Sequence, residues 1–168
     1  MLDDRSTDKS QEVLKRFLEG KACELILHDS NQGYTNTFNE GLSKATGDFI
    51  VDFALDDVRK LDFLSKSVAA LNDAGGEYGV SFSNAEYIDR NSKVTDIHTQ
   101  WLTEQGIIDW VPQGDVFQMV LNRYFICTPS MVIRKSVFDR LGGYDSDLSY
   151  EDFDFWVRSS RCWKYAYV

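Results

Sequence analysis

Residues 31–57 read NQGYTNTFNEGLSKATGDFIVDFALDD, a helix-forming segment followed by a strand and an acidic pair. Residues 35–45 are predicted to form a helix that ends at Gly47, because glycine readily adopts the backbone conformation that terminates helices. Residues 49–55 are almost continuously apolar, which predicts a buried strand. Asp56 and Asp57 follow at the carboxyl end of that strand. Ligands bind beyond this end in open α/β sheets, so the two carboxylates are candidate site residues.

Helical and strand patterns alternate through the rest of the chain. Helices are predicted over residues 8–19, 58–71, 136–141 and 151–161, and strands over residues 24–28, 78–88, 125–134 and 163–168. Residues 91–118 are less regular and are expected to form loops and short elements. This alternation predicts an α/β fold whose mainly parallel sheet is flanked by helices.

Length, composition and charge restrict the class of protein. A chain of 168 residues with 43% apolar residues is expected to form a single domain with a real core. Its formal net charge of −9 argues against a nucleic-acid partner, which would require a basic face. An acidic protein that handles phosphates needs a metal ion or a local basic patch to offset repulsion.

Several features of the sequence point to the cytoplasm. Cys23, Cys127 and Cys162 lack the spacing of metal ligands and are interpreted as reduced thiols. No stretch reaches the roughly 18 apolar residues of a membrane span, and no signal peptide is visible at the start. We therefore expect a cytoplasmic protein, with the inner face of a membrane as an alternative location.

The two acidic pairs suggest a metal and a proton acceptor, each with a structural alternative. Asp57, with Asp56 assisting, suits Mg²⁺ or Mn²⁺, because these ions prefer oxygen ligands. Asp57 would otherwise cap a helix that starts near Val58. Glu151 and Asp152 open the last predicted helix, where acids also favour the helix dipole and Ser149 followed by Asp152 mimics a capping box.

Three blocks of sequence resemble family 2 glycosyltransferases, which have the GT-A fold. The blocks are DDRSTD at residues 3–8, the segment 31–57, and PSMVIRKSVFDRLGGYDSDLSYEDFDFWVR at residues 129–158. They lie in the family's order and span nearly the whole chain. The resemblance implies a donor half at residues 1–90, which binds the nucleotide-sugar, and an acceptor-side half at residues 91–168.

The sequence departs from the family pattern at three places. The family's first strand, with its Pro-x-Asn-type motif, is absent, and the chain stops at a strand, so we expect a domain truncated at both ends. The common Asp-x-Asp-Asp motif reads Ala54-Leu55-Asp56-Asp57, without its first carboxylate. A frequent arginine before the second conserved asparagine is Phe38 here.

The resemblance also implies roles for individual residues. Asp3 and Asp4 would contact the base and ribose of the donor. Asp57 would hold the divalent cation, with Asp56 assisting toward the ribose or the metal. Asp152 would be the general base that takes the proton from the acceptor hydroxyl, and Glu151 would orient a loop or the acceptor.

The activity implied by the resemblance is metal-dependent transfer of a sugar from a nucleotide diphospho-sugar to an acceptor hydroxyl, with inversion. The acceptor would be a glycan or a lipid-linked molecule, in polysaccharide assembly. The alternatives are a non-catalytic fragment that binds sugar nucleotides or serves assembly, and a nucleotidyltransferase, which also uses paired acids and a metal. An unpaired sheet edge, left by a missing strand, would favour a homo-oligomer.

Overall fold

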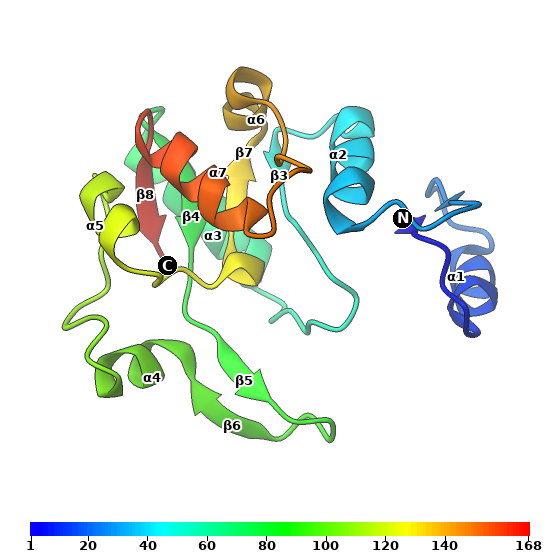
Figure 1. Cartoon of the computed structure of the whole chain (residues 1–168), viewed down its shortest axis with the longest axis horizontal. Coiled ribbons are helices and arrows are strands. Elements are labelled where there is room, and N and C mark those ends of the chain that lie inside the picture. Colours follow the sequence, from blue (N-terminus) through cyan, green and yellow to red (C-terminus); the bar gives the residue numbers. More distant parts are fainter. The chain divides into compact units, whose positions relative to one another are not determined.

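The structure, a computed structural model, describes residues 1–168 and divides into two compact units. Unit 1 comprises Met1–Thr46 and Gly143–Glu151, and unit 2 comprises Gly47–Gly142 and Asp152–Val168. Figure 1 shows the elements of both units along the chain. The expected division at residue 90 concerns donor and acceptor binding, and it stays a prediction.

Unit 1 contains two short parallel strands and two helices. Strand β1 (Leu2–Asp3) pairs in parallel with β2 (Ile26–Leu27). Helix α1 (Ser10–Leu18) connects them, and α2 (Tyr34–Lys44) packs against β1. A Cβ at Gly41 would lie 3.1 Å from Leu2 Cδ1. Glycine at this position therefore allows α2 to approach β1 closely.

Unit 2 is built on a four-stranded mixed sheet with the order β3-β7-β4-β8. Its strands are β3 (Phe49–Ile50), β4 (Tyr78–Phe82), β7 (Val132–Arg134) and β8 (Lys164–Tyr167). The β4–β8 pairing is parallel, whereas β7 runs antiparallel to both of its neighbours. The predicted α/β class with flanking helices is confirmed, and one of the three strand pairings in this sheet is parallel.

Helices cover both faces of this sheet. Helix α3 (Phe63–Ala74) packs on β4, β7 and β8, and α6 (Lys135–Leu141) follows β7 directly. Helix α7 (Glu151–Ser160) passes in front of the strands in Figure 1, with α3 behind them. The core between these layers contains side chains that are at most 1% exposed: Leu71, Val80, Phe82, Ile133, Phe155, Trp156 and Tyr165. Burial of these side chains is the main stabilising term of unit 2.

The middle of the chain forms a separate hairpin and two short helices. Strands β5 (Glu86–Ile88) and β6 (Val94–Ile97) pair antiparallel, followed by α4 (His98–Glu104) and α5 (Phe117–Asn122). The predicted strand at residues 78–88 is therefore two strands in two sheets. Asn84 lies at this break and stabilises it, because its Oδ1 accepts hydrogen bonds from Ala85 N at 2.9 Å and Thr99 N at 3.0 Å.

The segment around the first acidic pair differs from its prediction. Strand β3 ends at Ile50 instead of residue 55, and α3 begins at Phe63 instead of residue 58. The strand pairs with β7 only at Phe49 and Ile50, and β7 itself is short because a 3₁₀ helix at Thr128–Ser130 precedes it. Residues 51–62 are irregular, so the two carboxylates lie on a long loop.

The predicted strand at residues 125–134 is likewise shortened, because the 3₁₀ helix with Pro129 precedes β7. The other predicted elements lie within one or two residues of α1, α2, α6, α7, β2 and β8. None of the helices combines the length and the apolar character that a membrane crossing requires.

Gly79 offers a direct test of the packing in unit 2. A Cβ at this position would lie 2.7 Å from both Trp163 Cγ and Val137 Cγ2. The Gly79→Ala variant is therefore expected to lose about 1–3 kcal/mol of unfolding free energy, measured by urea denaturation. Gly76→Ala is the matched control, because a Cβ there meets nothing within 4 Å. Equal stability of the two variants would contradict this packing.

Candidate active site

The first acidic pair lies on the loop between β3 and α3. Asp56 is exposed and Asp57 is half-buried. Asp57 N donates to Ala54 O at 3.3 Å, which closes a turn at the pair. The alternative that Asp57 caps a helix starting at Val58 is wrong, because α3 begins at Phe63. The carboxylate of Asp57 is therefore not occupied in helix capping.

Arg59 supports the acidic loop. Its guanidinium lies over the rings of Phe53 and Phe63, at 4.6 and 5.1 Å from their centroids. Arg59 Nη2 donates to Asp52 O at 3.3 Å, and Nη1 lies 3.9 Å from Asp57 Oδ2. A loop without regular structure thus gains a fixed positive charge beside Asp57.

Asp152 lies in the first turn of α7, and two hydroxyl groups hold its carboxylate. Its Oδ2 accepts hydrogen bonds from Tyr124 OH at 2.7 Å and from Thr128 Oγ1 at 2.6 Å. Its Oδ1 accepts from the backbone N–H of Phe153 at 2.7 Å. Each carboxylate oxygen has two acceptor sites, so a further hydroxyl donor can still bind. The side chain is half-buried, which fixes it without removing it from solvent.

Tyr124 stays protonated and donates to Asp152. Burial, and then the bond to Asp152 and its negative charge, raise the pKa of Tyr124 well above its ordinary range. The Tyr124 ring lies 4.5 Å from the ring of Trp156, which is fully buried in the core. Tyr124 therefore acts as a rigid donor to the carboxylate.

Residues 124–128 contain two donors to Asp152 and the half-buried thiol of Cys127. Burial raises the pKa of the Cys127 thiol, and the negative charge of Asp57 adds to that shift. On either side of Cys127, Tyr124 and Thr128 donate to Asp152. One short segment thus supplies two of the groups that hold Asp152.

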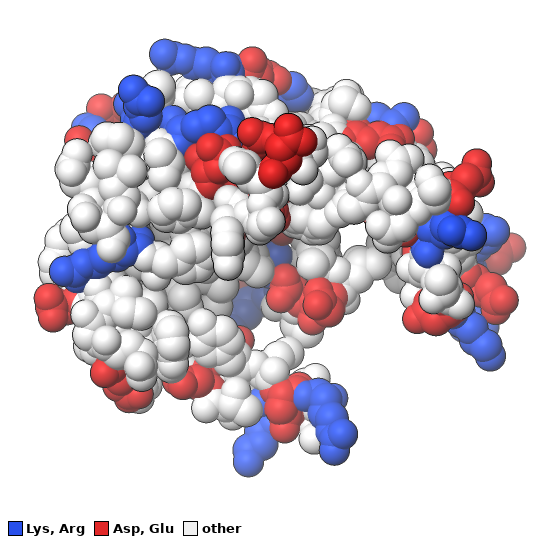
Figure 2. Space-filling model, viewed as in Figure 1, with Lys and Arg blue, Asp and Glu red and all other residues white.

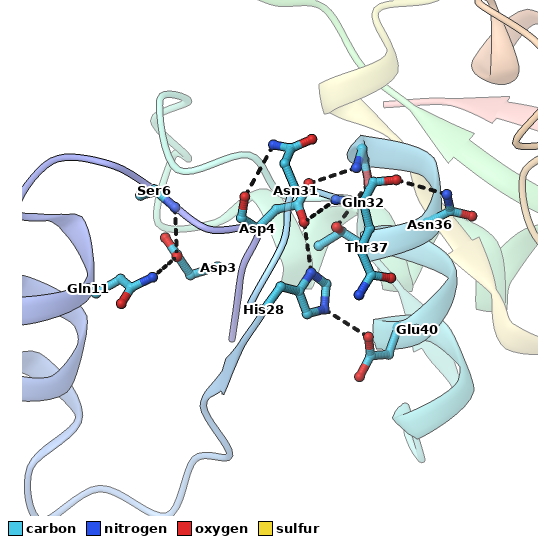
Figure 3. Close-up of polar contacts among 11 residues, drawn as sticks. Asp3, Asp4, Ser6, Gln11, His28, Asn31, Gln32, Asn36, Thr37 and Glu40 are labelled. Carbon is cyan, nitrogen blue, oxygen red and sulfur yellow. Dashed lines mark hydrogen bonds and ion pairs between the residues drawn. The ribbon is translucent and has the colours of Figure 1, made fainter.

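Asp3 and Asp4 lie in unit 1, at the end of β1 and directly after it. Asp3 is buried, and its Oδ1 accepts from Ser6 N at 2.9 Å and Gln11 Nε2 at 2.7 Å. Burial opposes ionisation, but these hydrogen bonds outweigh it and lower the pKa of Asp3. Asp4 accepts from the backbone N–H groups of Gln32 and Gly33, each at 2.8 Å (Figure 3).

Asn39 and Phe38 attach the loop before α7 to α2, within unit 1. The Asn39 amide accepts from Tyr144 N at 2.9 Å and donates to Tyr144 O at 2.8 Å. Phe38 stacks on the Tyr144 ring with 4.4 Å between centroids. A Cβ at Gly143 would lie 2.0 Å from Asn39 Oδ1, so only glycine fits there. This loop leads to Glu151, which is half-buried and opens α7.

The carboxylates on the loop between β3 and α3 fit one of the two common modes of binding a divalent cation. Nowhere do three or more His, Cys, Asp or Glu side chains gather to hold a metal ion. Mg²⁺-like ions are often bound by one or two carboxylates, with substrate phosphates and water supplying the other ligands. Asp57, with its neighbour Asp56, fits this second mode and not a closed protein site.

The fold is that of GT-A glycosyltransferases. A mannosyltransferase from Pyrobaculum calidifontis, in complex with GDP-Man and Mn²⁺, aligns with a TM-score of 0.71 at 16% identity. The alignment covers 99% of this chain and 44% of the mannosyltransferase. Staphylococcus aureus TarS 1–349 in complex with UDP aligns with a TM-score of 0.66 at 17% identity, over 99% of this chain and 50% of that protein.

Residues 1–142 match the sequence profile described as Glycosyl transferase family 2, and the chain belongs to that family. An Escherichia coli relative, UDP-Gal:alpha-D-GlcNAc-diphosphoundecaprenol beta-1,3-galactosyltransferase, is 25% identical over 86% of this chain and 48% of its own length. The uncharacterized glycosyltransferase MJ1057 of Methanocaldococcus jannaschii is 21% identical over 94% of this chain and 52% of its own. The chain thus spans about half the length of these two relatives.

The structure adds four residues that the sequence did not single out. Tyr124 and Thr128 bind Asp152 across 28 and 24 residues of chain, and Arg59 lies beside Asp57. His28 binds Asp4 across 24 residues. Only Arg59, two positions after Asp57, has a signal in the sequence, namely a cation next to the acidic pair.

Proposed function

We propose that this chain is a metal-dependent glycosyltransferase that moves a sugar from a nucleotide diphospho-sugar to an acceptor hydroxyl. The observation that carries the proposal is the arrangement at Asp152. In a chain of glycosyl transferase family 2, this carboxylate is held by two hydroxyl donors and still has acceptor capacity. A fixed carboxylate with room for another hydroxyl is suited to accept its proton.

The proposed donor contacts come from Asp56 and Asp57 and from Asp3 and Asp4. Asp57 would hold a divalent cation, with Asp56 assisting toward the metal or the ribose, and Asp3 and Asp4 would contact the nucleoside. When bound, the cation neutralises charge that develops on the departing nucleoside diphosphate. On the face that Figure 2 shows, Lys and Arg side chains are scattered among Asp and Glu side chains. With a net charge of −9, a cation is the simplest counterion for the diphosphate.

The proposed reaction is a direct displacement with inversion. The acceptor hydroxyl attacks the anomeric carbon while its proton moves to the Asp152 carboxylate, and the bond from sugar to phosphate breaks. Tyr124 and Thr128 keep the carboxylate oriented by donating to its Oδ2. Glu151 would orient the acceptor or the loop that precedes α7.

For the acceptor we propose a glycan or a lipid-linked sugar at the cytoplasmic face of a membrane. The name of the Escherichia coli relative specifies a diphosphoundecaprenol-linked acceptor and a UDP-linked donor. The mannosyltransferase structure contains a GDP-linked donor, so both nucleotides belong in the tests. Polysaccharide assembly is the setting that this acceptor favours.

The deciding experiment identifies the products formed from UDP- and GDP-sugars in the presence of Mn²⁺. Release of the nucleoside diphosphate, with the sugar on a hydroxyl acceptor, supports sugar transfer. Release of pyrophosphate from a nucleoside triphosphate and a sugar phosphate would instead indicate a nucleotidyltransferase. Nucleotide binding without any product would favour the non-catalytic alternative.

A further inference from the structure

His28 is a buried ionisable side chain that the proposed chemistry does not use. It follows β2, and its side chain is 5% exposed. Its Nδ1 lies 2.8 Å from Asp4 Oδ1, and its Nε2 lies 2.9 Å from Glu40 Oε2 (Figure 3). The ring therefore bridges the loop after β1 and helix α2, which are far apart in the sequence.

The partners of His28 define its protonation state. An ionised carboxylate only accepts hydrogen bonds, so both ring nitrogens have to donate, and this requires the imidazolium. The other histidine differs. His98 Nε2 lies 3.0 Å from Phe125 O and its Nδ1 lies 2.8 Å from Tyr87 OH, a hydroxyl that can donate. A neutral ring can donate to Phe125 O and accept from Tyr87 OH, so it satisfies both contacts of His98. In a neutral His28 one ring nitrogen would carry no proton, and its lone pair would face a carboxylate.

The charged groups around His28 also favour the imidazolium form. Hydrogen bonds to Asp4 and then Glu40 raise the pKa of His28 above its ordinary value, against the effect of burial. The same bond from His28 is the largest cause of the lowered pKa of Asp4. Of the other acids nearby, Asp3 on β1 turns its Oδ1 to Ser6 and Gln11, and Asp29 is exposed.

Asp4, which the His28 ring holds in place, binds in turn to the loop at residues 31–33. We call this loop the donor loop. Both carboxylate oxygens of Asp4 accept from this loop, at Gln32 N and Gly33 N. Asn31 Nδ2 donates to Asp4 O at 3.2 Å. Loss of the proton from His28 would leave one N–H for two carboxylates, and Asp4 would lose the positive charge that faces it.

We propose that His28 is a positioning residue whose imidazolium holds Asp4 and the donor loop in the form that binds the donor nucleotide. The inference rests on the proposed function, because it assumes that this region of unit 1 contacts the donor. Donor affinity would then depend on pH. The folded-state pKa of His28 is raised, so this contribution is complete below about 6.5, the unfolded value, and is lost as the pH rises through the folded value.

The protonation state is tested by NMR on the full chain with ¹⁵N-labelled histidine. The sequence holds two histidines, so the His28→Gln variant assigns both signals. Protonation of both His28 nitrogens at pH 7 is expected, and Glu40→Gln is expected to lower the midpoint of its titration. Glu24→Gln is the matched control, because Glu24 is an exposed acid of the same unit that pairs with Lys44 at 3.3 Å. A neutral His28 ring at pH 7 would overturn the proposal.

The functional consequence is tested by calorimetric titration of UDP and GDP, each with Mg²⁺, between pH 6 and pH 9. The dissociation constant of the wild type is expected to rise by up to about tenfold per pH unit above the His28 midpoint. We call the pH at which the dissociation constant begins to rise the break point. It should move to lower pH in Glu40→Gln, be absent in His28→Gln, and stay unchanged in Glu24→Gln. The nucleotide itself also ionises in this pH range, but its effect is the same for the wild type and the three variants. It therefore cancels when their dissociation constants are compared.

The outcomes separate this inference from the proposed function. Nucleotide binding with the same pH dependence in the wild type and in His28→Gln would overturn the inference and leave the proposed function intact. Absence of nucleotide binding by the wild type at every pH would overturn both. If His28→Gln does not fold, the comparison of wild type, Glu40→Gln and Glu24→Gln still decides, since a common break point contradicts the inference.

Discussion

Replacing Asp152 with asparagine is expected to lower the rate of sugar transfer by about 10²–10⁴-fold, the usual contribution of a general base. Asparagine has nearly the same shape and can still accept from Tyr124 and Thr128, so the fold of unit 2 should be retained. What it lacks is the basicity to take a proton from the acceptor hydroxyl. The measurement is the initial rate of nucleoside diphosphate release, with and without acceptor.

The matched control for Asp152 is Asp154→Asn. Asp154 lies on the same helix, and its Oδ2 pairs with Arg158 Nε at 2.6 Å. This half-buried pair does not include Asp152, Tyr124 or Thr128, so turnover should remain at the wild-type level. Equal losses of turnover in the two variants would show that α7 was disturbed as a whole, and would remove Asp152 from the role of base.

Replacing Asp57 with asparagine is expected to abolish metal-dependent binding of the donor. A bound ion supplies several kcal/mol of charge stabilisation at the transition state. Turnover should therefore fall by about 10²-fold or more, since each ~1.4 kcal/mol corresponds to a factor of ten. Thermal unfolding of the variant, with UDP or GDP and Mn²⁺ present, should show no stabilisation beyond that of the nucleotide-free protein.

Asp62→Asn is the control for Asp57. Asp62 lies on the same irregular segment, immediately before α3, and its Oδ2 pairs with Lys66 Nζ at 2.7 Å. Its loss removes one negative charge from the segment without touching the acidic pair. Retention of the Mn²⁺ effect in Asp57→Asn, or its loss in Asp62→Asn, would mean that the acidic pair does not bind the ion.

The fold class was predictable because it depends on local patterns. The spacing of apolar residues predicted four helices, α1, α2, α6 and α7, with ends within about two residues of the observed ones. The strand predicted at residues 24–28 is also present, as β2, and it pairs with β1 in a short parallel ladder. Each of these predictions needed only the spacing of neighbouring residues.

The errors arose where tertiary contacts overrode the local pattern. Leu61 and Leu64 have helical spacing, but their exposed fractions are 106% and 55%, and α3 begins only at Phe63. The length of β3 depends on β7, whose residues pair with it from 83 and 85 positions further along the chain. An apolar run therefore predicts that an element exists, while its partner determines its length.

The candidate site was predictable only in part, for a related reason. The acidic pairs stand out in the sequence because their neighbours form recognisable blocks. The residues that hold them do not, because Tyr124 and Thr128 reach Asp152, and His28 reaches Asp4 and Glu40, through folding alone. Side chains with supporting roles are visible only once the chain has folded.

The most direct test of the central claim is the thermal unfolding of the wild type with UDP or GDP, in Mn²⁺ and in a chelator. At a nucleotide concentration about 100-fold above the dissociation constant, the unfolding temperature should rise by roughly 5–10 °C in Mn²⁺. In the chelator it should stay at the nucleotide-free value. The same rise in both buffers, or no rise with either nucleotide, would contradict a donor site built on a cation held by Asp57.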